Sequence, residues 1–163
     1  MICIEGKTAF SGIAIGPIRE FAKKSSAVRR SHVDDPAAEC TRFEEAKKVA
    51  MEELGALYDK AVKEVGEDNA AIFEVHQMML DDLDFVESIE GLIENDRLNA
   101  EAAVSDTGAQ FAEMFAAMDD SYMQARAADI RDISARVIDI LTGEGESGIV
   151  SDVPCIVATC RPM

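Results

Sequence analysis

Residues 34–66 read DDPAAECTRFEEAKKVAMEELGALYDKAVKEVG, and this stretch sets the pattern on which the fold depends. Aspartate followed by proline signals a helix start, because the carboxylate caps free backbone N–H groups and proline has none to satisfy. Gly66 suits the helix end, since glycine readily adopts the backbone that closes a helix. About 30 residues at 1.5 Å each predict a helix roughly 45 Å long. Its apolar residues recur at steps of three and four: Phe43, Ala46, Ala50, Leu54, Leu57, Ala61 and Val65.

Three further helices are expected on the same reasoning. The second should break at the acidic pair Asp81 and Asp82, where Asp82 can cap a continuation in a new direction. Each helix has one apolar and one polar side, which is the pattern of helices in a bundle. The expected starting residues are Asp68, Asn99 and Asp119 or Asp120, and Gly143 is expected to end the last helix.

Short apolar segments lie on both sides of this helical region. Ile2–Ile4 and Ile13–Ile15 precede it, and Val153–Ala158 follows it, which predicts short strands and tight turns. The segment Arg19–Arg30 has five basic residues, one acidic residue and no helical period, so we interpret it as a crossing segment. Two or three short strands cannot bury a sheet face alone. The expected fold class is therefore mostly α: a four-helix bundle with a kinked second helix, at residues 34–143, inserted in an incomplete α/β domain at residues 1–21 and 149–163.

The composition excludes several classes of partner. The chain has 163 residues, with 16 Lys and Arg against 32 Asp and Glu, so its net charge is −16. Such a surface repels nucleic-acid phosphates and anionic membrane lipids. No apolar run approaches the 18 or so residues of a membrane span, and the first ten residues do not resemble a signal peptide. Four cysteines without a Cys-x-x-Cys pair are interpreted as free thiols. We expect a cytoplasmic protein with no nucleic-acid or membrane partner.

The charge of the second helical region is one-sided. From Glu64 to Asp96 there are eleven acidic side chains and no Lys or Arg. A solvated helix face is the usual explanation of a charge run, but ordinary exposed helices mix signs to gain i,i+4 pairs. Methionine and leucine side chains within the run offer an adaptable apolar contact. We therefore favour a docking surface for a basic protein over a merely hydrated face.

The sequence lacks the usual motifs of an independent active site. Glu74-Val75-His76 is one residue shorter than the Glu-x-x-His of a dimetal bundle and is not repeated, and the other histidine is His32. No nucleophile elbow or Walker-type phosphate loop occurs. We therefore predict no catalytic residue and no metal site in this chain. For His76, a half-buried packing role competes with a role on the acidic docking surface, and we favour the latter.

A stripe of charge marks the fourth expected helix. Four charged residues spaced by three, three and four positions share one side of this helix and can pair in sequence: Arg126, Asp129, Asp132 and Arg136. Charge networks stabilise structure more often than they catalyse. We interpret Asp129, Asp132 and Arg136 as a structural charge network, and expect Arg126 to reach the docking surface.

Several motifs are similar to those of one bacterial family. The segment Gly12–Pro17 reads GIAIGP, and Ala71–Asp82 reads AIFEVHQMMLDD. Further along, Met118–Tyr122 reads MDDSY, and Arg126–Ile133 reads RAADIRDI, with Arg136-Val137 after it. In this order the motifs resemble the N-terminal region of Enzyme I, the phosphoenolpyruvate-protein phosphotransferase of the bacterial sugar phosphotransferase system. The resemblance runs to about Ala158, although Phe10-Ser11 stands where the family usually has Ser-Pro.

The resemblance implies a definite function. Enzyme I accepts a phosphoryl group from phosphoenolpyruvate on a histidine of its α/β domain and passes it to a histidine of the small carrier HPr. Residues 34–143 would then be the HPr-binding domain, and the α/β part an incomplete phosphohistidine domain that joins the remainder of Enzyme I. The phosphorylated histidine is expected beyond the end of this chain, which alone is predicted inactive. No cofactor is expected for this part, and magnesium is expected for the full-length enzyme. The implied HPr contacts are Glu67, Ile72, His76, Met79, Leu80, Asp82, Asp84 and Phe85, with Arg126 at the edge.

Other interpretations remain beside this one. A free-standing helical adaptor, or a paralogue that serves nitrogen regulation, would also bind a basic carrier protein. An adaptor has no use for the expected strands at the two ends, whereas a split α/β domain requires them. Pyruvate phosphate dikinase is related to Enzyme I, but it is normally longer at this end.

Overall fold

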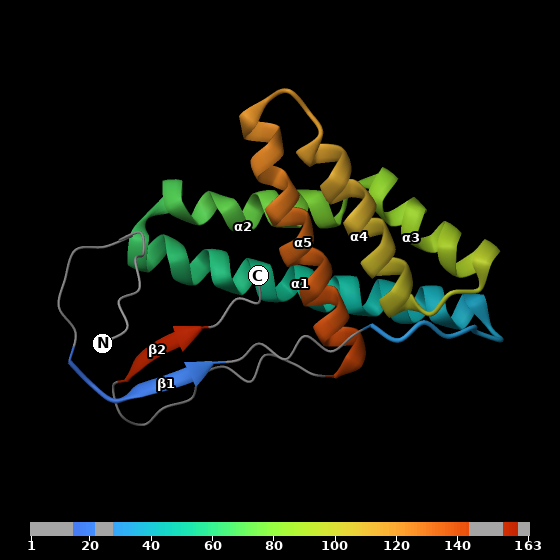
Figure 1. Ribbon diagram of the computed structural model, residues 1–163, viewed down its shortest axis with the longest axis horizontal. Coiled ribbons are helices and arrows are strands. Elements are labelled where there is room, and N and C mark those ends of the chain that lie inside the picture. The colour runs from blue at the N-terminus through green and yellow to red at the C-terminus, as the bar shows by residue number, and fades with distance from the viewer. Residues whose placement is uncertain (1–14, 22–27, 144–154, 160–163) are drawn as a thin grey trace, which may run out of the picture. The chain divides into compact units, whose positions relative to one another are not determined.

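The computed structural model describes residues 15–21, 28–143 and 155–159. The chain divides into two compact units, one comprising residues 1–26 and 147–163 and the other residues 27–146. Within the described residues, the larger unit contains five helices and the smaller unit two short strands. The protein is therefore mostly helical, as the apolar periodicity predicts (Figure 1).

The helices of the larger unit agree closely with the expected pattern. The predicted interruption at Asp81 and Asp82 is confirmed, and it separates two helices where a single kinked one was expected. Before the first helix, His32 forms an antiparallel bridge with Leu98. None of the described helices is both long and apolar enough to cross a lipid bilayer. The bounds are Pro36–Val65 for α1, Glu67–Leu80 for α2, Leu83–Asp96 for α3, Ala100–Ala116 for α4 and Ser121–Thr142 for α5.

Capping residues explain where these helices begin and end. The Asp35 carboxylate accepts a hydrogen bond from a first-turn N–H of α1 at 3.1 Å, and Asp82 and Asp120 cap α3 and α5 in the same way. Each cap satisfies a backbone donor that has no partner inside its helix. Gly66 follows α1, and Gly143 ends α5 with φ 68°, in the left-handed region that favours glycine.

The helices form two antiparallel pairs that cross. α1 packs mainly against α2, and α4 packs mainly against α5. Figure 1 shows the α4–α5 pair crossing the α1–α2 pair steeply, while α3 continues beyond the end of α2. Because α5 also contacts α1 and α2, the crossing brings side chains of α5 beside those of α2.

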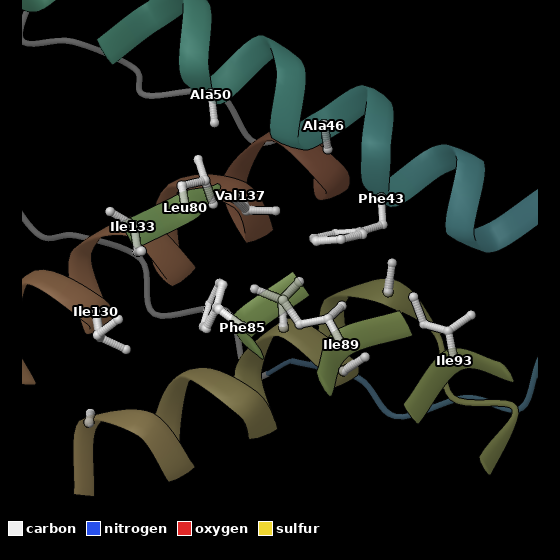
Figure 2. Packing of buried hydrophobic residues seen from close by; sticks show 14 of the residues in the cluster. Phe43, Ala46, Ala50, Leu80, Phe85, Ile89, Ile93, Ile130, Ile133 and Val137 are labelled. Carbon is white, nitrogen blue, oxygen red and sulfur yellow. The ribbon is translucent and has the colours of Figure 1, made fainter. Parts of the chain in front are cut away.

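The core lies between these helices. Figure 2 shows Phe43 of α1, Phe85 of α3 and Val137 of α5 turned toward the same space. Phe85 also meets Phe111 of α4 edge to face, with ring centroids 5.4 Å apart. Full burial of a large apolar side chain stabilises a protein by about 1.5–3 kcal/mol. The largest fully buried apolar residues are Phe43, Leu54, Leu80, Phe85, Ile89, Ile93, Val104, Ile130, Ile133 and Val137.

A polar network joins the first turns of α1 and α4 to the segment before α1. Arg42 donates to Glu39 at 2.6 Å, to Glu101, and to a backbone carbonyl near the end of α5 at 3.1 Å. The buried Asn99 side chain accepts from the Ser31 N–H at 2.8 Å and donates to Glu101 at 2.7 Å. Burial acts to raise the pKa of Glu101, but its hydrogen bonds and the charge of Arg42 outweigh burial and lower this pKa below its usual value.

The smaller unit holds two parallel strands, β1 at Ile18–Phe21 and β2 at Ile156–Thr159. Ile18 lies opposite Ile156, whose N–H donates to the Pro17 carbonyl at 2.8 Å. The β2 strand overlaps the expected Val153–Ala158 strand, whose first residues lie outside the described part of the chain.

Of the expected N-terminal strand segments, the structure describes only Ile15, and the strand that it does show begins later, at Ile18. Ile15 is not in a strand, and β1 occupies the start of the segment expected to cross between the two units. Pro17 explains the difference, because proline lacks the N–H that a ladder needs and is tolerated where a strand begins. Ile2–Ile4 and the first residues of Ile13–Ile15 lie outside the described residues.

Candidate docking surface

Acidic side chains crowd the surface of α2 and α3. The run from Glu64 to Asp96 begins at the end of α1, and all of its eleven acidic residues except Glu90 are exposed. Asp81 pairs with Lys47 Nζ of α1 at 3.0 Å, and the other carboxylates of the run have no basic partner within residues 28–143. We name as the acidic surface the residues Glu67, Asp68, Glu74, Asp81, Asp82, Asp84 and Glu87.

Apolar side chains are exposed among these carboxylates. Ile72 is 37% exposed, and Met78 and Leu83 are each 73% exposed. Single exposed apolar residues are ordinary on protein surfaces. Within a uniformly charged surface, however, they provide area that a partner can bury after the charges have brought it close.

Two of the implied contacts are core residues. Leu80 is 0% exposed and Phe85 is 1% exposed. Leu80 ends α2 and Phe85 lies in the first turn of α3, and the cap at Asp82 sets the bend at which both side chains pack inward. Neither offers surface to a partner, so their assignment as contacts is corrected here to core residues. Met79 is partly buried against the same core.

The remaining implied contacts lie at or near the surface. Glu67 and Asp84 are exposed in the first turns of α2 and α3. Asp82 is exposed even though its carboxylate accepts the Phe85 N–H at 3.2 Å. The side chain of His76 is mostly buried, at 13% exposure, because it points toward α5.

A polar cluster joins α2 to α5. Oδ2 of Asp129 accepts a hydrogen bond from Nη1 of Arg126 at 2.8 Å, and its Oδ1 lies 3.4 Å from Nε2 of His76. Nε2 of His76 is buried and makes no hydrogen bond within the described part of the chain. Nη2 of Arg126 donates to the Tyr122 hydroxyl, and the guanidinium carbon lies 4.4 Å from the centroid of the Tyr122 ring. Arg126 is thus held between a carboxylate and an aromatic ring.

The surroundings of Arg126 keep it charged and partly covered. The hydrogen bond to Asp129 raises the pKa of Arg126 above its usual value, although burial opposes this. The side chains of Arg126 and Asp129 are only 14% and 17% exposed, whereas Tyr122 is 63% exposed. Tyr122 is not among the predicted site residues, although its i,i+4 spacing from Arg126 permits a cation–π contact within one helix.

The four charged residues of the stripe on α5 do not all form ion pairs with one another. Arg126 pairs with Asp129, but Nη1 of Arg136 donates to Glu53 of α1 at 2.9 Å. Asp132 is exposed and forms no hydrogen bond or ion pair with any described residue. Steps of three residues turn less than a full helical turn, so Asp132 faces solvent while its neighbours in the stripe meet α1 and α2.

A metal ion has no obvious place in this surface. Within the described residues, no group of three or more His, Cys, Asp or Glu side chains is arranged to hold one. The carboxylates of the acidic surface therefore do not fit a magnesium site.

The fold and the site define a class of protein: a helical unit with an acidic surface, connected at both ends of its sequence to a unit that contains a parallel pair of strands. Comparison with known proteins gives the family, because residues 5–126 match the family described as PEP-utilising enzyme, N-terminal. The chain belongs to this family.

The relatives and a solved structure agree with this membership. The chain is 43% identical over 140 residues to the phosphoenolpyruvate-protein phosphotransferase of Bacillus sp. (strain S), covering 86% of this chain and 24% of that protein. It is 38% identical over 157 residues to the protein of the same name from Priestia megaterium, covering 95% of this chain and 27% of that protein. A solution structure of Enzyme I (nEIt) superposes with a TM-score of 0.75 at 29% identity, covering 88% of this chain and 58% of that one.

The resemblance to the N-terminal region of Enzyme I is thereby confirmed. The chain spans about a quarter of the length of the curated relatives that it matches.

Proposed function

We propose that this chain is the carrier-docking part of a phosphoenolpyruvate-protein phosphotransferase, and that its larger unit binds HPr. The observation that carries the proposal is the exposed acidic surface on α2 and α3, which, apart from the pair of Asp81 with Lys47, has no counter-charge from the described residues of its own chain. A basic carrier would supply those charges, and complementary charges increase both the rate and the specificity of association. The relatives that the chain matches carry the name of this activity.

The proposed contact set is adjusted to the observed exposure. Met78 and Leu83 join it, because both are exposed apolar residues beside the acidic surface. Leu80 and Phe85 leave it, because they are buried. The proposed HPr contacts are Glu67, Ile72, His76, Met78, Met79, Asp82, Leu83 and Asp84, with Arg126 at the edge.

The smaller unit is proposed to be part of an α/β phosphohistidine domain. β1 and β2 pair in parallel although the whole helical unit separates them in the sequence. Parallel strands need a long crossover connection, which supports a helical bundle at residues 34–143 inserted into one α/β domain at residues 1–21 and 149–163. The need for magnesium is proposed for the full-length enzyme, outside the residues described in this chain.

Phosphoryl transfer is proposed to use a histidine other than the two present here. His32 is exposed in a short antiparallel bridge, and Nε2 of His76 is buried beside Asp129. A carboxylate next to His76 would repel an incoming phosphoryl group. The chain can be incubated with phosphoenolpyruvate, magnesium and the C-terminal part of a curated relative. Mass spectrometry should then find both histidines unmodified, and a phosphohistidine on either one would overturn this assignment.

The alternative is a helical adaptor, or a nitrogen-system paralogue, that binds another basic carrier. Such a protein would use the same acidic surface but would not need the parallel pair of β1 and β2. Binding to the HPr of a sugar system favours the first proposal, and failure to bind HPr at low salt favours the adaptor.

The proposal is tested by removing two carboxylates from the acidic surface. The double variant E67Q/D84N should weaken HPr binding about five- to tenfold at low ionic strength, at roughly 0.6 kcal/mol for each exposed charge. Isothermal titration calorimetry measures the dissociation constant. The matched control is E45Q/E52Q, which removes two exposed carboxylates on the side of α1 opposite its buried stripe. Equal weakening by both double variants would contradict docking on α2 and α3.

A further inference from the structure

Met78 places an exposed sulfur atom among the carboxylates of α2. It is 73% exposed, the highest value among the described methionines, and Met114 follows at 49%. Met79, its neighbour in the chain, is partly buried against the core. Glu74 is exposed one helical turn before Met78, and Asp82 caps the next helix four residues after it. The thioether is therefore open to small molecules from solvent within the acidic surface.

The charge of this surface favours neutral oxidants over anionic ones. The carboxylates repel anionic oxidants but not neutral hydrogen peroxide. A thioether needs no ionisation to react, because its sulfur carries a free electron pair. The sulfur attacks one peroxide oxygen, the O–O bond breaks, and the other oxygen leaves as water with the proton of the first. Methionine is thereby oxidised to its sulfoxide and the peroxide is reduced.

The cysteine of the larger unit is a poorer target for peroxide. By sequence, residues 27–146 contain one cysteine, Cys40, and its side chain packs against the core. Burial and the charges of Glu94 and Glu90 raise the pKa of its thiol. The thiolate is the reactive form of cysteine, so a raised pKa slows its oxidation. Within this unit the sulfur of Met78 is the more accessible target.

Oxidation changes what Met78 offers to a partner. The flexible apolar side chain becomes polar, and the sulfoxide oxygen accepts hydrogen bonds but donates none. Burying a polar group without a hydrogen-bond partner costs free energy. A carrier that covers Met78 would therefore lose an apolar contact and would have to desolvate a polar atom instead.

We infer that Met78 is an oxidation site, through which hydrogen peroxide reversibly weakens the docking of the carrier. This inference rests on the proposed function, because Met78 belongs to the proposed HPr contacts. Methionine sulfoxide reductases return the sulfoxide to the thioether, so the loss of binding is reversible. Docking thereby responds to the oxidants in its surroundings, with Met78 as the responding side chain.

Peroxide treatment of the 163-residue chain tests the inference. The chain is treated with hydrogen peroxide, desalted, and titrated with untreated Bacillus subtilis HPr by calorimetry at low ionic strength. The dissociation constant of the wild type should rise about tenfold, the cost of one unpaired polar group in an interface. Peptide mass spectrometry should find Met78 oxidised before Met79. Methionine sulfoxide reductases A and B should restore the affinity, whereas dithiothreitol alone, which reduces disulfides, should not.

Three variants control for the other sulfur atoms of the chain. Met78→Leu removes the oxidisable sulfur, so its dissociation constant should be the same before and after treatment. The readout is this ratio within each variant, so any effect of the substitution itself cancels. Met114→Leu removes the next most exposed sulfur, outside the proposed contacts, and should keep the rise of about tenfold. Met78→Gln carries a polar amide of similar length and should weaken binding without peroxide.

Several results would overturn the role of Met78. An equal rise in M78L and wild type, or loss of the rise in M114L, would show that another sulfur is responsible. Wild-type affinity of M78Q would show that the interface tolerates a polar side chain at this position. A lower free energy of unfolding of the oxidised chain, measured with urea, would attribute the loss of binding to the fold.

Two results separate the inference from the proposed function. If the wild type carries Met78 sulfoxide and still binds HPr with unchanged affinity, the inference fails and the proposed function stands. If the untreated wild type does not bind HPr at low ionic strength, the proposed function fails, and the inference fails with it.

Discussion

At the scale of single residues, two neighbouring side chains at the start of α3 differ in exposure, which assigns one to the stability of the fold and the other to binding. Leu83 and Phe85 are two positions apart, yet Leu83 is 73% exposed and Phe85 only 1% exposed. Both are large apolar residues in the same helical turn, so the sequence alone does not tell which one is buried. Phe85 is buried because it shares one side of α3 with the buried Ile89 and Ile93, whereas Leu83, two positions earlier, lies on the other side.

Phe85→Ala should lower the free energy of unfolding by about 3–5 kcal/mol, because it leaves a cavity in the core and removes the ring contact with Phe111. Leu83→Ala should change it by less than about 0.5 kcal/mol and should weaken HPr binding instead. Urea unfolding followed by circular dichroism gives both stabilities. A larger loss for L83A than for F85A would contradict the assignment of Phe85 to the core.

Glu101→Gln should lower the free energy of unfolding by about 1–2 kcal/mol at neutral pH, because it weakens the charge-assisted hydrogen bonds of the Arg42 network. Folding lowers the pKa of Glu101. The ionised Glu101 side chain therefore stabilises the fold fully above the pKa of the unfolded chain, about 4.3 for Glu. This stabilisation is lost as the pH falls through the pKa of the folded state. The stability difference between wild type and E101Q should therefore narrow in acid. Urea unfolding at neutral and acidic pH measures it, and a pH-independent difference would contradict the lowered pKa.

At the scale of elements, capping signals located the helices well. Asp35, Asp82 and Asp120 begin three helices as expected, because a cap depends on residues within one helical turn. Asn99 also precedes a helix as expected, but its side chain bonds the segment before α1 instead of capping α4. The position of β1 could not be predicted, because a strand in a two-stranded sheet is defined by its partner more than 130 residues away.

Asp82 combines two roles that substitution can separate. Asp82→Ala should lower the free energy of unfolding by about 1 kcal/mol through loss of the α3 cap, whereas Asp82→Asn should lower it by only a few tenths. Both remove one charge and should weaken HPr binding alike. Thermal unfolding and calorimetric titration measure the two effects. If D82N kept wild-type affinity, Asp82 would be a cap alone.

α4 and α5 approach closely at Gly108, and a substitution there tests how much this close packing stabilises the protein. A Cβ at this position would overlap Oγ of Ser134 and lie 2.8 Å from its Cβ. Gly108→Ala should therefore lower the free energy of unfolding by about 1–3 kcal/mol, despite the better helix propensity of alanine. Adding Ser134→Gly should restore part of the loss in urea unfolding. An unchanged or raised stability of G108A would show that the helices separate at little cost.

At the scale of the whole molecule, the sequence predicted a helical bundle and an acidic surface, because both depend on periodicity and composition. It did not predict which contacts cross between helices. The pair of Asp129 and His76, and the bonds of Arg42 to Glu101 and to the Leu141 carbonyl, join residues more than 50 positions apart. Such pairs depend on how α4 and α5 cross α1 and α2, which periodicity does not specify.

The most direct test of the central claim is a titration of the isotopically labelled chain with HPr at two ionic strengths, followed by backbone resonance shifts. We predict that the shifting resonances belong to Glu67–Leu80, Leu83 and Asp84 and to the start of α5, and that higher salt weakens the binding. Shifts confined to other helices, or no shifts at low salt, would contradict docking of a basic carrier on the acidic surface.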